Sequence, residues 1–298
     1  MSDVYKQLQE KFILPNARED WSEYRTSLTK LVNAQAGEHV LVIGAGRCND
    51  IELSDLHFDR ITLMDVDEAA MREAVEELSP EFRDRVSVRC ASVTGIEEAD
   101  VMAFCDRVLN RVRSLGTGFT AARLAGCMHE ELDRLEDRLS GLANRLETLL
   151  PVDTYDVIVM NGVCSQLFSM LLFFIRSVVA SVSDAIVRET SSGSDAVFPE
   201  QVNVAEIAEK RLSEMNVSVI PIVNRAIIRA TRKTAIFGNE DPEDGHVEGA
   251  YHCISDVREN YSPEEQTLFW TFHKARNVIY RMTIQIVDKG GVIWKEER

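Results

Sequence analysis

Residues 39–46 read HVLVIGAG, an apolar run that ends in a turn with two glycines. Gly37 precedes the run, so glycine stands on both sides of it. A short apolar run bounded by glycine is typical of a strand buried on both faces of a parallel sheet. The sequence therefore predicts a buried strand over 39–43 and a tight turn at Gly44-Ala45-Gly46.

Four further apolar runs have the length of buried strands. They cover residues 61–64, 86–90, 155–160 and 234–238. An amphipathic helix over 20–36 precedes the first strand. Asn49 and Asp50 are placed to cap a helix after the glycine turn, and Asp67 is placed to cap the next helix. Strands and helices in alternation predict a doubly wound, Rossmann-like α/β fold with a mostly parallel sheet.

Two more strands are predicted over 268–272 and 278–287. Because a parallel crossover needs about a dozen residues or more, their short connection predicts an antiparallel C-terminal hairpin, which completes a seven-stranded sheet. We interpret the chain as a single domain, 1–298, with helical additions at 96–150 and 163–231. The second addition is expected to hold an apolar helix over 167–182, an exposed loop at 191–195, a helix over 202–215 and another ending near Thr231.

The composition limits the partners of the chain. Its formal net charge is -16, which opposes nucleic-acid backbones and anionic membrane surfaces, so we expect neither as a partner. The longest apolar run, 170–175, is far shorter than the roughly 20 residues that span a bilayer.

The cysteines and histidines give no metal-ligand pattern. The six cysteines are scattered without a CxxC pair, and the chain start has no apolar signal segment, which predicts reduced thiols in a cytoplasmic protein. His246, His252 and Cys253 are interpreted as a chance grouping in an acidic loop, and no metal site is expected.

The residues that follow the predicted strands are candidates for binding, because ligands of doubly wound sheets lie at the carboxyl ends of the strands. Glycine after the first strand lets the backbone approach a ligand. Asp65 ends the second strand 21 residues beyond Gly44, where a carboxylate can accept hydrogen bonds from both ribose hydroxyls. The pair predicts an adenosine-type cofactor, whereas the glycines alone would also fit a plain tight turn.

Two cofactors compete for such a site. The dinucleotide pattern GxGxxG needs a third glycine where this chain has Asn49, and it rests a pyrophosphate on a helix N-terminus. Asp50 would repel that pyrophosphate, although Arg47 offsets part of the repulsion. S-adenosylmethionine has no phosphate and carries an ammonium and a sulfonium, so nearby carboxylates attract it. The electrostatics favour S-adenosylmethionine.

From about Val40 to Met160, the sequence resembles the class I S-adenosylmethionine-dependent methyltransferases. VLVIGAG at 40–46 looks like their glycine-rich motif, LMDVD at 63–67 like the ribose-binding motif, ASVTG at 91–95 like the adenine segment and DVIVMN at 156–161 like the fourth strand. The resemblance implies methyl transfer from S-adenosylmethionine and an antiparallel final strand. It implies cofactor contacts from Gly44, Ala45, Gly46, Asn49, Asp65, Val66, Ser92, Val93, Asn161 and Gly162, with Arg25 pairing with the cofactor carboxylate.

Three residues depart from the family pattern: Val42 in place of a frequent acid, Cys48 in place of a frequent glycine and Ser92 in place of the usual aspartate. Two alternatives therefore stay open. One is an NAD-dependent oxidoreductase. The other is a non-catalytic protein that keeps the nucleoside-binding fold for assembly or regulation.

The acceptor of the methyl group is not identified by the sequence beyond a small molecule or a peptide side chain. No catalytic residue is predicted, because the sulfonium carries its own leaving group and the protein chiefly aligns the acceptor. The residues placed at the acceptor edge are Cys164, Ser165, Gln166, Asn239 and Glu240, for which loop hydrogen bonding and helix capping are equally good explanations. Tyr24 lies beside Arg25 on the first helix, where it can fold over the cofactor, and packing of that helix against the sheet explains it equally well. Nothing distinguishes His129, His246, His252 or His273 as a base.

The helical additions are expected to build the acceptor pocket, as a lid or as a dimer face. Residues 170–175 favour a core helix, with contact between two subunits of a homodimer as the second interpretation. The acidic run 240–244 is interpreted as a solvated loop, and attraction of a cationic acceptor is the alternative.

Overall fold

The computed structural model describes residues 16–115, 121–190, 201–241 and 248–292. They form a seven-stranded sheet in the order β3-β2-β1-β4-β5-β7-β6. Its strands are β1 (His39–Ile43), β2 (Arg60–Asp65), β3 (Val86–Cys90), β4 (Tyr155–Asn161), β5 (Thr231–Glu240), β6 (Glu264–His273) and β7 (Val278–Asp288). The strands β1 to β5 pair in parallel, while β7 runs antiparallel to both β5 and β6. The predicted doubly wound sheet with its antiparallel hairpin is confirmed.

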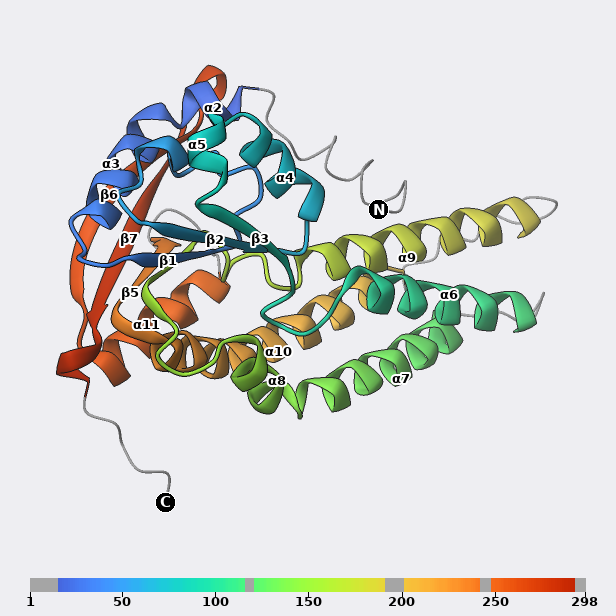
Figure 1. Ribbon diagram of the computed structural model, residues 1–298. Helices are drawn as coiled ribbons and strands as arrows, with labels where there is room; N and C mark the ends of the chain where they lie inside the picture. Colours follow the sequence, from blue (N-terminus) through green and yellow to red (C-terminus); the bar gives the residue numbers. More distant parts are fainter. Residues whose placement is uncertain (1–15, 116–120, 191–200, 242–247, 293–298) are drawn as a thin grey trace.

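Four helices belong to one face of the sheet (Figure 1): α2 (Ala17–Asp20), α3 (Ser22–Asn33), α4 (Glu68–Glu76) and α5 (Pro80–Arg83). Tyr24 and Leu28 of α3 pack with Val40 and Val42 of β1 in the core of this face. The predicted cap is also present, because the Asp67 carboxylate accepts a hydrogen bond from the Ala70 N–H at 3.0 Å.

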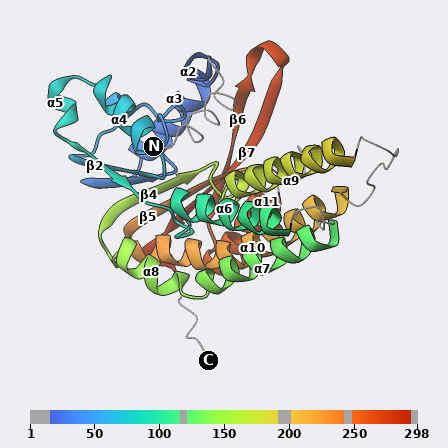
Figure 2. The same ribbon diagram turned by 90° about the vertical axis from the view of Figure 1, so that its right-hand side faces the viewer.

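The opposite face carries the helical additions. These are α6 (Glu98–Leu115), α7 (Ala121–Leu139), α8 (Leu142–Leu149), α9 (Ser169–Thr190) and α10 (Gln201–Ala230). The same face also carries α11 (Glu248–Tyr261), which lies outside the two predicted additions. The long helices α6, α7, α10 and α9 contact one another in a ring and project beyond the sheet as a bundle (Figures 1 and 2). Their apolar side chains join the sheet in one continuous core. None of the described helices is both long enough and apolar enough to cross a bilayer.

The segment after β1 differs from the prediction. Asn49 and Asp50 do not cap an α-helix, because residues 44–56 form turns and a single short 3-10 helix, η1 (Leu53–Asp55). Cys48 has φ 55°, which turns the chain away from a helical path, and the Asp50 carboxylate is bonded to the side chain of Asn161.

Two other helices also differ from the prediction. The expected pair of helices at 202–215 and near Thr231 is one helix, α10, that continues through Pro221. Ile220 and Val223 flank this proline and are at most 1% exposed, so packing offsets the lost backbone hydrogen bond. The helix α11 was not predicted. The loop expected at 191–195 lies outside the described residues.

Candidate functional site

Asp65 anchors the candidate site at the end of β2. Its Oδ2 accepts a hydrogen bond from the Gly46 N–H at 2.9 Å, and its Oδ1 accepts one from the Asp67 N–H at 2.9 Å. A carboxylate oxygen has two lone pairs, so each oxygen of this half-buried group keeps one acceptor position beyond these bonds. The carboxylate is therefore both fixed in direction and able to receive two hydroxyl donors.

The two glycines of the loop have different roles. Gly44 has φ +71°, and a Cβ there would lie 2.3 Å from Cγ2 of Val163, so this glycine admits the loop that follows β4. Gly46 has φ +46°, and a Cβ there would have no atom within 4 Å. The open space for a ligand is therefore at Gly46, while Ala45 is buried with its N–H directed to the Met64 carbonyl.

Cys48 stands where a third glycine is frequent, and its backbone adopts a conformation that favours glycine. Its φ of 55° lies in the left-handed region, which costs a non-glycine residue about 1–3 kcal/mol. The side chain is 1% exposed and packs in the core of the α3 face. The departure from the pattern therefore changes the packing behind the loop and leaves the turn in place.

A chain of hydrogen bonds joins α3, β4 and the glycine loop. The Tyr24 hydroxyl donates to Oδ1 of Asn161 at 2.7 Å, and Nδ2 of Asn161 donates to Oδ2 of Asp50 at 2.6 Å. Gly238 makes room for the amide, because a Cβ at that position would lie 2.0 Å from Oδ1 of Asn161. Burial, with the charge of Asp50 next, raises the pKa of Tyr24 well above its usual value, so the phenol stays a donor.

Burial also raises the pKa of Asp50, although the bond from Asn161 opposes the shift. Between the ordinary pKa of about 3.9 and this raised value, the folded state binds more protons than the unfolded state. The free energy of unfolding therefore falls as the pH rises through this window, by about 1.4 kcal/mol for each pH unit.

We expect Asp50→Asn to raise the free energy of unfolding at neutral pH, because the amide keeps an acceptor for Asn161 and removes the half-buried charge. The two proteins should converge in stability at pH values below the ordinary pKa of aspartate. Chemical denaturation of both proteins across the pH range measures this difference. A variant that is less stable than the parent protein at pH 7 would contradict the expectation.

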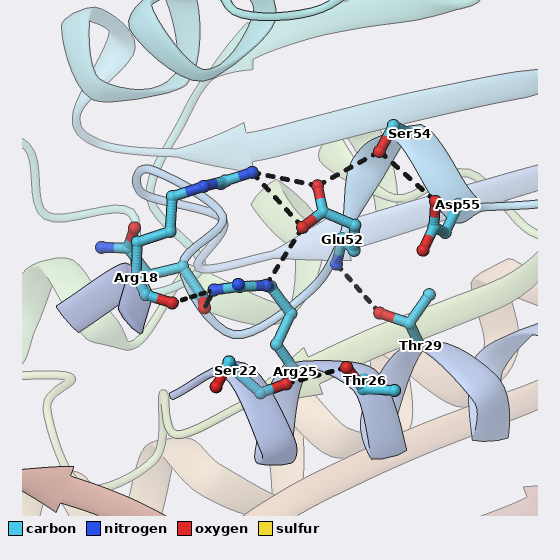
Figure 3. A network of polar contacts seen from close by, with 9 residues as sticks. Arg18, Ser22, Arg25, Thr26, Thr29, Glu52, Ser54 and Asp55 are labelled. Carbon is cyan, nitrogen blue, oxygen red and sulfur yellow. Dashed lines mark hydrogen bonds and ion pairs between the residues drawn. The ribbon is translucent and has the colours of Figure 1, made fainter. Parts of the chain in front are cut away.

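Arg25 is engaged within the protein (Figure 3). Its Nε pairs with Oε2 of Glu52 at 3.1 Å, and its Nη1 donates to the carbonyl oxygens of Arg18 at 2.7 Å and Asn49 at 3.1 Å. Arg18 also pairs with Glu52, at 3.1 Å. The guanidinium of Arg25 thus ties α3 to the loop that follows the glycines. To pair with a ligand carboxylate, it would have to break its ion pair with Glu52.

The remaining predicted residues follow the strand ends. Val66 is 41% exposed beside Asp65, while Val93 is buried in the core of the bundle face. The Ser92 hydroxyl accepts from the Thr94 N–H at 3.2 Å and so shapes its own loop. Gly162 has φ +64° and donates its N–H to the Gly238 carbonyl at 2.8 Å. Ser92, Asp65, Gly46 and Asn161 thus lie along one edge, in the strand order β3, β2, β1, β4.

Sequence reasoning did not predict the pairing of Asp50 with Asn161, or the cavity behind the loop. A cavity of about 200 Å³ lies between the 47–54 segment and the helices α4 and α5. Arg18, Arg47, Glu52 and Phe82 are among its lining residues, and none of the predicted cofactor-binding residues lines it.

The side chains expected at the acceptor edge are also placed. Ser165 donates to Oε1 of Glu240 at 3.0 Å, and Gln166 donates to the Gly162 carbonyl at 3.2 Å. A hydrogen bond with Cys253, followed by burial, raises the pKa of the Cys164 thiol well above its usual value. Within the described ranges, no group of three or more His, Cys, Asp or Glu side chains is arranged to hold a metal ion.

Comparison with models of protein families gave no match, and neither did comparison with curated protein sequences. Among solved structures, the chain is similar to the N-methyltransferase NodS from Bradyrhizobium japonicum WM9, with 13% identity over 92% of this chain and 97% of that chain, at a TM-score of 0.43. The same enzyme in complex with S-adenosyl-L-homocysteine matches at 11% identity over 96% and 98%, also at 0.43. The methyltransferase domain of bacterial-CtHen1-CN matches at 12% identity over 91% and 98%, at 0.36. At such low similarity, the function has to be argued from the residues of this chain.

Proposed function

We propose that this protein binds S-adenosylmethionine and transfers its methyl group to a small molecule or a peptide side chain. The observation that carries the proposal is Asp65, whose two oxygens are each fixed by one backbone N–H and each keep one acceptor position. Two acceptors at the end of β2 suit the two neighbouring hydroxyls of a ribose. The open space at Gly46 lies directly beside them.

The surroundings of Asp65 also fit a nucleoside. The exposed side chain of Val66 offers an apolar surface at the edge where an adenine would follow the ribose. Ala91, whose N–H donates to the Asp65 carbonyl at 3.0 Å, brings the loop with Ser92 to the same place. An apolar contact with a few polar groups around it is the usual construction of a small-molecule site.

The bound cofactor would supply an activated methyl group on its sulfonium. The residues of this chain would bind and orient the partners of the reaction. Asp65 would hold the ribose, and the Tyr24–Asn161–Asp50 chain would fix the polar surface at the end of β4. The negative charge of Asp50 favours a cationic ligand there.

The same edge is less suited to a dinucleotide. A pyrophosphate needs the free N–H groups at the start of a helix, but turns and a short 3-10 helix follow the glycines. The half-buried Asp50 carboxylate adds repulsion on this side of the loop. These features disfavour the oxidoreductase, while a non-catalytic protein would be distinguished by its failure to bind any of these cofactors.

Calorimetric titration of the purified protein with S-adenosylmethionine, S-adenosylhomocysteine and NAD tests the proposal. We expect micromolar binding of the first two and no binding of NAD. Binding of NAD alone would indicate a dehydrogenase, and no heat from any of the three would indicate a fold kept without its chemistry.

The partners follow from the proposal and the charge of the chain. We propose a small-molecule or peptide acceptor, no nucleic-acid or membrane partner, and a cytoplasmic location. Besides building the acceptor pocket, the helices of the bundle are proposed as the contact surface of a homodimer. Leu171, Phe174 and Ile175 of α9 are buried in the core of the described chain, which favours the core interpretation of the apolar run.

A further inference from the structure

Glu240, the last residue of β5, has an incomplete set of hydrogen bonds. Its Oε1 accepts from the Ser165 hydroxyl at 3.0 Å. Its Oε2 is buried and has no hydrogen-bond partner among the residues that the structure describes. A buried acceptor without a donor costs about 1–3 kcal/mol, and more when the group is charged. A ligand with a hydrogen-bond donor would therefore satisfy this carboxylate oxygen, for which the described residues supply no donor.

The position of Glu240 places this oxygen beside the candidate site. Gly238, two residues earlier on the same strand, faces the side chain of Asn161, and side chains two apart on a strand share a face. Asp50 is hydrogen-bonded to Asn161, the last residue of β4, and Glu240 to Ser165, which follows β4, so the two carboxylates flank the end of this strand. The acidic run that begins at Glu240 was interpreted as a solvated loop, but its first residue is a half-buried part of the sheet.

A second side chain at this strand end also lacks partners. Asn239 is 1% exposed, and neither its Nδ2 nor its Oδ1 has a hydrogen-bond partner among the described residues. Adjacent side chains on a strand point to opposite faces, so Asn239 does not supply the donor for Glu240. Asp241, by contrast, is satisfied, because it pairs with Arg281 at 2.9 Å. Side-chain atoms of Asn216, Trp270, His273 and Gln285 also lack a partner among the described residues, but Glu240 is the one buried carboxylate in this group, and it lies where the acceptor edge was predicted.

The charge at this edge selects among acceptor nucleophiles. A thiolate, phenolate or carboxylate would approach two carboxylates and be repelled by them. An amine brings N–H donors for Oε2 of Glu240 and becomes positively charged as it is methylated. A fixed negative charge beside the atom that gains positive charge stabilises the transition state.

We propose that the methyl acceptor is an amine, which Glu240 binds through its unpartnered Oε2 while Ser165 holds Oε1. This inference rests on the proposed function. The neutral amine, which has released one proton to solvent, uses its lone pair to form the N–C bond as the C–S bond breaks and leaves its electron pair on sulfur. The positive charge passes from sulfonium to the new ammonium, and that ammonium is held by Glu240.

The test uses isosteric probes that differ in the nucleophile. Phenethylamine and phenethyl alcohol form one pair, and hexylamine, hexanol and hexanoate form a second set. Binding of each to the full chain is measured calorimetrically, with and without S-adenosylhomocysteine, and methylation is measured as release of S-adenosylhomocysteine from S-adenosylmethionine. We expect at least one amine to bind about tenfold more tightly than its alcohol, and Glu240→Gln to remove this preference.

Glu240→Gln keeps an oxygen for Ser165, so its fold should persist, and Asp241→Asn is the matched control that should keep the preference. Equal binding of amines and alcohols, or a preference that survives in Glu240→Gln, would overturn the inference. Failure of S-adenosylhomocysteine to bind the parent protein would instead count against the proposed function. If the parent protein does not bind S-adenosylhomocysteine but still binds amines more tightly than alcohols, and Glu240→Gln removes this preference, the result supports an amine site without the proposed function.

Discussion

Asp65→Ala is expected to weaken the binding of S-adenosylhomocysteine by about 2–4 kcal/mol, or roughly 30- to 1,000-fold in Kd. The variant loses both acceptors for the ribose hydroxyls, and each lost hydrogen bond is taken as about 1–2 kcal/mol. It also releases the Gly46 N–H, which donates to Oδ2 at 2.9 Å, so the loop loses its tether to β2. Calorimetric titration of the variant measures the change.

Asp67→Ala is the matched control for this prediction. Asp67 lies two residues further on and caps α4 through the Ala70 N–H. Its loss should lower the free energy of unfolding by about 1 kcal/mol and leave the affinity for S-adenosylhomocysteine unchanged. Equal affinity of Asp65→Ala and the parent protein would remove Asp65 from the site. Equal losses of affinity in both variants would assign the effect to the loop rather than to the ribose contact.

The parts of the fold that the sequence predicts are those with local signals. The run over 39–43, the acid at Asp65 and the cap at Asp67 each depend on a few adjacent residues, and the structure confirms each of these elements. The helix α11 has a similar signal, because Ala250, Cys253, Ile254 and Val257 are buried at helical spacing. That signal was hidden by the acidic and glycine-containing segment before it, which reads as a loop.

The parts that the sequence does not predict depend on contacts between distant segments. Tyr24 and Asn161 are 137 residues apart in sequence, and Asn161 and Asp50 are 111 apart. Each of these residues alone fits a cap or a loop, and only the parallel pairing of β1 with β4 brings them together. The missing helix after β1 has the same cause, since Asp50 is bonded to Asn161 on β4 rather than to the start of a helix.

Gly238→Ala is expected to lower the free energy of unfolding by about 2–3 kcal/mol through this same chain of hydrogen bonds. The new Cβ would lie 2.0 Å from Oδ1 and 3.0 Å from Cγ of Asn161, so the amide has to move. Its movement breaks the bonds from Tyr24 and to Asp50, which are worth about 1 kcal/mol for the neutral donor and more for the carboxylate. Chemical denaturation of the variant measures the loss.

A double-mutant cycle separates this cause from a general effect of alanine in a strand. Asn161→Ala alone removes the same two hydrogen bonds and also Oδ1 and Cγ, the two atoms nearest to a Cβ at position 238. Cδ1 of Ile284 remains at 3.1 Å, but it is the end of a flexible side chain that can move by a few tenths of an ångström. In that background, Gly238→Ala should cost little or should stabilise the fold by up to about 1 kcal/mol, because alanine restricts the unfolded chain. The two substitutions should therefore couple by about 2 kcal/mol, since residues in contact are not additive. Additive losses would show that Asn161 is not what Gly238 accommodates, and that the hydrogen-bonded chain at the end of β4 does not depend on this glycine.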